Sequence, residues 1–255
     1  MRGKIDTVSE SVPTSENPCM SGLVNGAKIN IVFKNGEYDL GVNEDGYVRT
    51  TLRTVEPVWE VVASGSNFKL KHINSGQWLF YGDNSLYELS PTEATEFNTK
   101  VKNSSERLYE LQRVGASWCI NMSKGSGLNY NIGEYTSGDQ NNALYIINSS
   151  KYKLPNLSTE SVYTIRFTSS SSYGYRINGS NVTVGNSYSK LSLVGTYNKL
   201  ALFFNGSYLY LNDSNILVTS STEKTYFRLI PKSIQSNRDF EFVIVGNETK
   251  ALNAF

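Results

Sequence analysis

The side chains that enzymes use for acid–base or nucleophilic chemistry are scarce in this sequence. His72 is the only histidine, so a Ser-His-Asp or Cys-His arrangement would depend on that one residue, whose alternating surroundings indicate a surface or turn-adjacent position. Two cysteines, Cys19 and Cys119, are too few for a disulfide framework or a cysteine-rich zinc site. The acidic residues of 37–45 surround an expected turn, where carboxylates are usually solvated. The sequence therefore predicts no catalytic residue, no metal ligand and no cofactor, and we expect that the protein is not an enzyme.

Aromatic side chains beside amides and carboxylates are abundant instead, with 17 Tyr, 11 Phe and 3 Trp. A pyranose packs its C–H face on such a ring, while neighbouring polar groups hydrogen-bond its hydroxyls, so the combination is typical of shallow carbohydrate sites. The leading candidates lie in the repeat with the longest insertion, because loops on a rigid scaffold tend to carry function. They are Tyr130, Asn131, Tyr135, Asp139 and Gln140, followed by Tyr81, Asp83 and Asn84. An ordinary solvated polar loop is the alternative interpretation of 130–140.

The elements that must position these residues are short strands. In FKLKHI (68–73) and YTIRF (163–167) every second side chain is apolar, the period of a half-buried antiparallel strand. The Asn-Gly pairs at 35–36, 178–179 and 205–206 favour tight hairpins, because Asn and Gly accept the positive φ of these turns. No segment has a convincing helical period. The sequence therefore predicts an all-β chain.

A repeated order of strands and turns recurs along the chain. Five segments share it, and a partial sixth follows: 28–62, 68–101, 108–147, 162–194, 199–230 and 240–255. Equivalent positions just after a turn hold an aromatic residue, namely Tyr38, Trp78, Trp118, Tyr175 and Tyr208. Because the equivalent aromatic of a repeat barrel usually fills the core, we expect Trp78 and Trp118 to pack inward.

Six units with a connector after the third predict two threefold assemblies. We expect a flexible leader at 1–24, a first β-trefoil-like domain at 25–150, a connector at 151–160 and a second such domain at 161–255. The sixth unit is roughly twenty residues shorter than the others. Either the chain is truncated, or the leader or another subunit completes this unit, or the second half is a β-sandwich.

This organisation resembles the β-trefoil of the ricin-type lectin family, in which three four-stranded units form a domain and the last strand carries a Gln-x-Trp motif. The segments ending VWEVV, EFNTKV, ALYII and YFRLI look like that strand, and GDQNNALYII (138–147) is the nearest to the motif, with Leu144 or Tyr145 in place of the tryptophan. Only Trp59 keeps the tryptophan, without the glutamine. The resemblance implies tandem trefoils that bind carbohydrate.

The charge balance and hydropathy exclude other partners. The 24 basic and 23 acidic residues nearly cancel, so we expect no nucleic acid partner. The sequence has no apolar run of about 18 residues, and we expect no membrane insertion. The first 22 residues lack the apolar core of a signal peptide. The composition, rich in Asn, Ser, Thr, Gly and Tyr, is nevertheless common in extracellular or surface-displayed modules, which is the localisation we expect.

Two hypotheses for function follow from these patterns. The first is a non-catalytic, lectin-like module that recognises a glycan or glycoconjugate at a surface, with weak single sites strengthened by multivalent display. The second is a structural or adhesion protein, such as a virion surface or fibre component, whose loops make the subunit contacts of a homo-oligomer.

Overall fold

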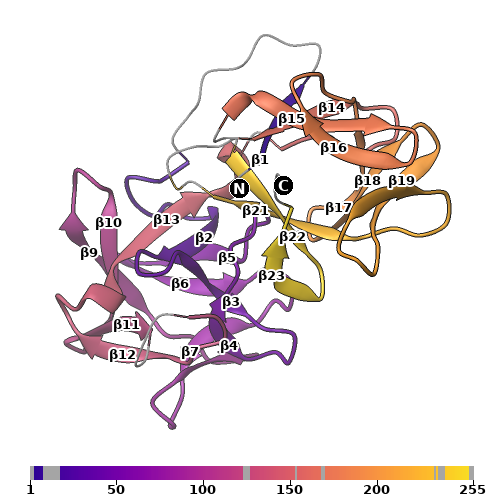
Figure 1. Ribbon diagram of the computed structural model, residues 1–255. Coiled ribbons are helices and arrows are strands. Elements are labelled where there is room, and N and C mark those ends of the chain that lie inside the picture. Colours follow the sequence, from indigo (N-terminus) through magenta and orange to yellow (C-terminus); the bar gives the residue numbers. More distant parts are fainter. Residues whose placement is uncertain are drawn as a thin grey trace. The chain divides into compact units, whose positions relative to one another are not determined.

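The computed structural model describes residues 3–7, 18–122, 127–152, 154–167, 170–232, 234 and 239–252 (Figure 1). In these residues the regular structure consists of 23 strands and two single-turn 3-10 helices, η1 (Gln140–Asn142) and η2 (Ser149–Lys151), which confirms the all-β prediction. Over the same ranges, no helix has the length and apolar character needed to cross a membrane. The chain divides into two compact units. We call Pro18–Lys151 the inserted unit, and Met1–Asn17 together with Tyr152–Phe255 the split unit.

The inserted unit is a β-trefoil. Its three repeats comprise β2 (Lys28–Phe33), β3 (Tyr38–Val42), β4 (Val48–Thr51) and β5 (Trp59–Ser64); β6 (Asn67–His72), β7 (Trp78–Tyr81), β8 (Tyr87–Ser90) and β9 (Phe97–Asn103); and β10 (Leu108–Arg113), β11 (Trp118–Met122), β12 (Ile132–Thr136) and β13 (Leu144–Asn148). In each repeat the first strand pairs with the last, and the middle two form a hairpin. Each last strand also pairs with the first strand of the following repeat, and β13 returns to β2. Six strands therefore close into a barrel, and three hairpins cap it.

Aliphatic residues, rather than the equivalent aromatics, fill much of this barrel. Trp59 is fully buried and its indole N–H donates to the Leu40 carbonyl at 2.7 Å. Trp78 is only half-buried, and Trp118 is 42% exposed, so the expectation that Trp118 packs inward is wrong. The physical reason is the position along the strand: each tryptophan is the first residue of its strand, at the rim, and the residues that follow, Leu79 after Trp78 and Ile120 after Trp118, are fully buried.

The split unit contains the other three repeats, and the last of them has only two strands of its own. They comprise β14 (Tyr163–Phe167), β15 (Ser170–Asn178), β16 (Asn181–Gly185) and β17 (Ser192–Thr196); β18 (Lys199–Phe204), β19 (Ser207–Leu211), β20 (Leu217–Ser220) and β21 (Phe227–Pro231); and β22 (Asp239–Ile244) and β23 (Asn247–Ala251). Between β18 and β19, Asn205 and Gly206 both have positive φ, 45° and 83°, as the Asn-Gly hairpin signal predicts.

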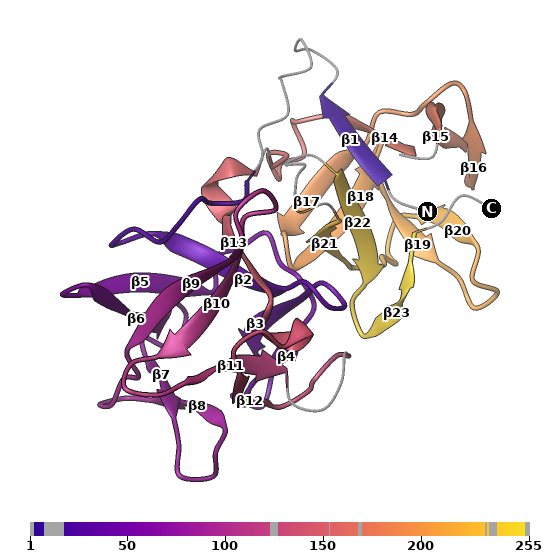
Figure 2. The same ribbon diagram turned by 90° about the vertical axis from the view of Figure 1, so that its left-hand side faces the viewer.

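Strand β1 (Gly3–Thr7) completes this second barrel. It pairs antiparallel with β14 from Gly3↔Phe167 to Thr7↔Tyr163, and with β22 at Gly3↔Phe240 and Lys4↔Asp239. Figure 2 shows β1, in indigo, alongside β14. The ring then runs from β14 through the Tyr163–Leu191 bridge to β17, and on through β18, β21 and β22 back to β1. The second half is thus a trefoil rather than a β-sandwich, and the N-terminus supplies the last strand of the sixth repeat.

The boundaries of the units differ from those expected. The range expected as a flexible leader contains strand β1, while residues 8–17 lie outside the described part of the chain. Cys19 forms a bridge with Ile147, and the Met20 N–H donates to the Ile146 carbonyl at 2.8 Å, so the inserted unit begins before residue 25. In the expected connector, Tyr152 is buried with its ring 6.3 Å from that of Phe240. The boundaries were missed because strand β1 and residues 19–20 pair with strands more than 100 residues away, and such pairing cannot be recognised from the residues next to them in the sequence.

Candidate functional site

Two exposed aromatic rings meet at the open end of the β11–β12 hairpin in the inserted unit. Trp118 opens β11, and Tyr135 lies near the end of β12, opposite Cys119 in the register. The side chain of Tyr135 is 52% exposed, and its ring centre lies 6.4 Å from that of Trp118, with the planes at 58°. We call them the Trp118–Tyr135 ring pair. They present aromatic surface to solvent without the burial that a structural role would require.

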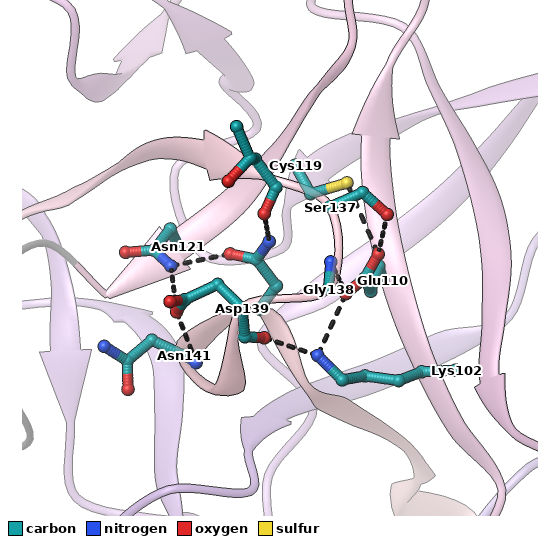
Figure 3. Close-up of polar contacts among 10 residues, drawn as sticks. Lys102, Glu110, Cys119, Asn121, Ser137, Gly138, Asp139 and Asn141 are labelled. Atoms are coloured by element: carbon teal, nitrogen blue, oxygen red, sulfur yellow. Dashed lines mark hydrogen bonds and ion pairs between the residues drawn. The ribbon is translucent and has the colours of Figure 1, made fainter.

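The turn that follows β12 is clamped to the barrel by Glu110, which is buried on β10 (Figure 3). Its Oε2 accepts from the Ser137 hydroxyl at 2.6 Å, and its Oε1 accepts from the Gly138 N–H at 2.8 Å and the Lys102 ammonium at 3.0 Å. Burial alone would raise the pKa of Glu110, but these hydrogen bonds and the Lys102 charge outweigh it, and the pKa is lowered. An ionised Glu110 therefore fixes the start of this turn.

Asp139 continues the turn as the N-cap of η1. Its Oδ1 accepts from the Asn141 N–H at 2.8 Å and from the Asn121 amide at 3.1 Å, and its carbonyl accepts from the Lys102 ammonium (Figure 3). The amide of Asn121 also donates to Asn142 at 2.6 Å, so η1 is tied to β11. Gln140 opens η1 with an exposed side chain. Tyr135, Asp139 and Gln140 thus belong to one braced segment, in which the Asp139 carboxylate serves mainly to hold the turn.

Tyr130 and Asn131 lie at the other end of β12. The Tyr130 N–H donates to the Thr50 hydroxyl at 2.7 Å, its carbonyl accepts from the Thr50 N–H at 3.0 Å, and Asn131 forms a bridge with Arg49. Both side chains are exposed, and they border the hairpin of the first repeat. Five residues of extended chain span about 16 Å, so the structure separates Tyr130 from Tyr135 instead of joining them in one site.

Tyr81, Asp83 and Asn84 lie on the β7–β8 hairpin of the second repeat. The Arg113 guanidinium lies 4.6 Å from the Tyr81 ring centre, which covers one face of that ring. Asp83 and Asn84 are exposed in the turn, and the Asn84 side chain accepts from the Leu86 N–H at 3.0 Å. The turn reaches β12, because a Cβ on Gly133 would lie 3.3 Å from the Ser85 carbonyl oxygen.

A buried ion pair connects this hairpin to β12. Glu134, whose side chain is 2% exposed, accepts from Arg113 Nε at 2.8 Å and Nη2 at 2.9 Å, and from the Tyr87 hydroxyl at 2.7 Å. Burial and the nearby Glu134 charge raise the pKa of Tyr87 well above its ordinary value, so its hydroxyl stays protonated and donates. Glu134 precedes Tyr135 directly, and the ion pair therefore fixes the strand that carries the exposed ring.

Two parts of this arrangement were not predicted from the sequence. Trp118 was assigned to the core, although its place directly after a Gly-Ala-Ser turn indicates a rim position as well. Arg113 and Glu134 stand 21 residues apart, and no local pattern joins them. His72 lies at the end of β6 beside a turn, as expected, but the expectation of a surface position is wrong: the residue is buried, with Nδ1 2.9 Å from the Ser75 hydroxyl and its ring 5.5 Å from that of Trp59. Among the described residues, no group of three or more His, Cys, Asp or Glu side chains could hold a metal ion.

Comparisons with known proteins show a likeness of fold. No protein-family model and no curated protein matches the sequence. A solved mosquitocidal holotoxin has a TM-score of 0.62 at 10% identity, over 91% of this chain and 31% of the holotoxin. A ricin B-like lectin of Macrolepiota procera, in complex with lactose, has a TM-score of 0.44 at 9% identity, over 50% of this chain and 99% of the lectin. ThreeFoil, a designed threefold symmetric protein, has a TM-score of 0.39 at 14% identity, over 47% and 96%. This chain thus spans about a third of the holotoxin, with which it shares the fold alone.

Proposed function

We propose that the protein is a non-catalytic, lectin-like module that binds glycans or glycoconjugates, in an extracellular or surface-displayed setting. The observation that carries the proposal is the Trp118–Tyr135 ring pair, two exposed aromatic side chains on a hairpin whose backbone is held by buried polar contacts. Because the backbone that carries the rings is already ordered, binding of a sugar does not have to order it, and less of the favourable free energy of contact is lost.

Gln140, in the segment that follows Tyr135, is proposed to hydrogen-bond the hydroxyls of a sugar that packs on the ring pair. Gln140 has an exposed amide that can donate to and accept from hydroxyls, and it starts the helical turn that Asp139 caps. The remaining candidates, Tyr130, Asn131, Tyr81, Asp83 and Asn84, are proposed as separate contacts for further sugar units. The reason is that segment 130–131 and the turn of 82–86 both border β12.

A glycan array followed by calorimetric titration of the strongest ligand tests the proposal. Trp118→Ala and Tyr135→Ala should each raise the dissociation constant at least about tenfold, a loss of ~1.4 kcal/mol that is usual for an aromatic anchor. Gln140→Ala should weaken binding by a smaller factor, because it removes hydrogen bonds worth about 0.5–1.5 kcal/mol.

The matched control is Tyr173→Ala, which removes a tyrosine of similar exposure, 49%, from β15 of the split unit. Its affinity should equal that of the unchanged protein. Failure of every glycan to bind a correctly folded protein contradicts the proposal, and so does full affinity in the Trp118→Ala and Tyr135→Ala variants.

A further inference from the structure

A second surface, in the split unit, alternates ammonium groups with aromatic rings. We call it the lysine–tyrosine surface; its members are Lys199 and Phe203 of β18, Tyr208 of β19, and Lys224 and Tyr226 of the segment before β21. The Lys199 ammonium lies 4.8 Å from the centre of the Tyr226 ring. The Lys224 ammonium lies 4.9 Å from the centre of the Tyr208 ring and 5.5 Å from that of Tyr226. The Phe203 and Tyr208 rings are 5.1 Å apart. The five side chains therefore form one continuous row.

Both lysines of this row are exposed, and their charges are not neutralised by a neighbour. Across the described part of the chain, neither Lys199 nor Lys224 forms an ion pair, whereas Lys232 of the same unit pairs with Glu241 at 2.8 Å. The acidic residue nearest to Lys224 in sequence is Glu223, and the one nearest to Lys199 is Asp213; both are exposed. In the described part of the chain neither carboxylate forms an ion pair with a lysine of the row, so both ammonium groups are available to an anionic partner.

The rings hold the lysines in position. A cation over an exposed aromatic face gains about 0.5–1 kcal/mol, enough to restrict a long side chain without covering its charge. The three aromatic residues are half-buried, so a part of each borders the same solvent as the ammonium groups. A partner that fits this row has to combine an anionic group with an apolar face.

We propose that the lysine–tyrosine surface is a second binding site, for a saccharide that carries a carboxylate or a sulfate group. The anionic group would lie between Lys199 and Lys224, and the C–H face of the sugar would pack against the ring edges of Tyr226 and Tyr208. A nucleic acid shares this chemistry, but it demands a broader basic footprint than two lysines in a chain of net charge +1. The site differs from the ring pair in the inserted unit, where the polar side chain proposed to contact the sugar is the Gln140 amide rather than a lysine.

Titration of the full chain with charged and neutral sugars tests the inference. The probes are galactose 6-sulfate, sialyllactose, their neutral parents galactose and lactose, inorganic sulfate and a single-stranded oligonucleotide. At least one of the two acidic sugars should bind about tenfold more tightly than its neutral parent and than inorganic sulfate, and the difference should shrink as salt is added, because the charges are exposed. Preferential binding of galactose 6-sulfate indicates a sulfate ligand, and preferential binding of sialyllactose indicates a carboxylate ligand.

Substitutions locate the binding. Lys224→Ala and Lys199→Ala should each abolish most of the preference for the acidic sugar, while Lys224→Arg should keep it. The matched control is Lys232→Ala, which removes the same charge from a lysine that already has an acidic partner. Trp118→Ala should leave the preference unchanged, so failure of the first site and failure of this one are told apart.

Three results would overturn the inference. They are equal affinity for acidic and neutral sugars, an unchanged preference in the Lys199→Ala, Lys224→Ala double variant, and tighter binding of the oligonucleotide or of inorganic sulfate than of either acidic sugar. Since both lysines are exposed, circular dichroism should show an intact fold in each variant.

Discussion

Removal of the first seven residues should destabilise the split unit and leave the inserted unit intact. The deletion takes away strand β1, which makes five residue pairings with β14 and two with β22. If each pairing contributes on average one backbone hydrogen bond with a net value of about 0.5–1.5 kcal/mol, the loss is roughly 3–10 kcal/mol. A domain of this size is stable by only about 5–15 kcal/mol, so the split unit should unfold at far lower urea concentration or fail to fold.

The chain provides a probe that separates the two units. All three tryptophans, Trp59, Trp78 and Trp118, lie in the inserted unit, so their fluorescence follows that unit alone, whereas far-ultraviolet circular dichroism follows both. In urea, the deletion should shift or abolish the transition that only circular dichroism detects. The transition in tryptophan fluorescence should keep its midpoint.

A synthetic peptide of residues 1–8 should restore the lost transition in proportion to its concentration, because binding to the folded form stabilises it by mass action. The control peptide carries Ile5→Pro, which removes a backbone donor and prevents regular pairing. The reasoning is refuted if the deletion leaves both transitions unchanged. It is also refuted if the fluorescence transition falls together with the other, since β1 would then support the whole chain rather than one barrel.

Three further predictions concern single residues. Because the pKa of Glu110 is lowered from 4.5, its contacts stabilise the protein above that pH and are lost as pH falls through the folded value; Glu110→Gln should flatten the fall in melting temperature between neutral pH and about pH 3. Glu134→Ala should lower the free energy of unfolding of the inserted unit by about 2 kcal/mol or more, measured by fluorescence in urea, because Arg113 and the Tyr87 hydroxyl lose their buried partner. Gly195→Ala should destabilise the split unit by at least about 1–3 kcal/mol in circular dichroism, because φ is 122° and the new Cβ would lie 2.4 Å from the Lys199 carbonyl oxygen.

Each of these has an outcome that contradicts it. If the melting temperature of Glu110→Gln falls with pH as steeply as that of the unchanged protein, a group other than Glu110 causes the loss of stability in acid. Full stability in Glu134→Ala would show that Arg113 and the Tyr87 hydroxyl find other partners, such as water, once Glu134 is removed, and would contradict the argument. For Gly195 the control is Gly206→Asn, at a turn with φ of 83° and no atom near the new Cβ, where an asparagine is tolerated. Equal stability of Gly195→Ala and this control would refute the argument from crowding.

Local signals in the sequence predicted the parts of the fold that depend on neighbours along the chain. The two-residue period of 68–73 and the Asn-Gly pair at 205–206 act within a few residues, and the structure confirms both as a strand and a hairpin. Strand β1 could not be predicted in the same way, because its partner β14 lies about 160 residues further along and five residues carry too short a pattern. Strand β1 pairs with the free edges of β14 and β22, and these two edges face the same gap only after the repeats of the split unit have assembled.

The candidate sites, too, could be predicted only where they depend on residues that are close in the sequence. Exposed Tyr135 and Gln140 could be selected from composition and turn position. Trp118 could not, because it occupies the same position in its strand as the other aromatic residues of the repeats, and this position does not determine whether its side chain is buried. In the split unit, the alternation of Lys199, Tyr226, Lys224 and Tyr208 comes from three segments that meet only after folding. A sequence pattern describes one strand at a time, whereas these surfaces are formed across strands.

The closure of the split unit by β1 has a consequence for synthesis on the ribosome. Strand β1 pairs with β22, which begins at residue 239, so after synthesis β1 has to wait until all the residues between the two strands have been translated. At about 5–20 residues per second this delay is of the order of tens of seconds, long enough for the inserted unit to finish first. Strand β1 therefore docks only after β22 has been made, and in a crowded polysome it could instead complete the barrel of a neighbouring chain.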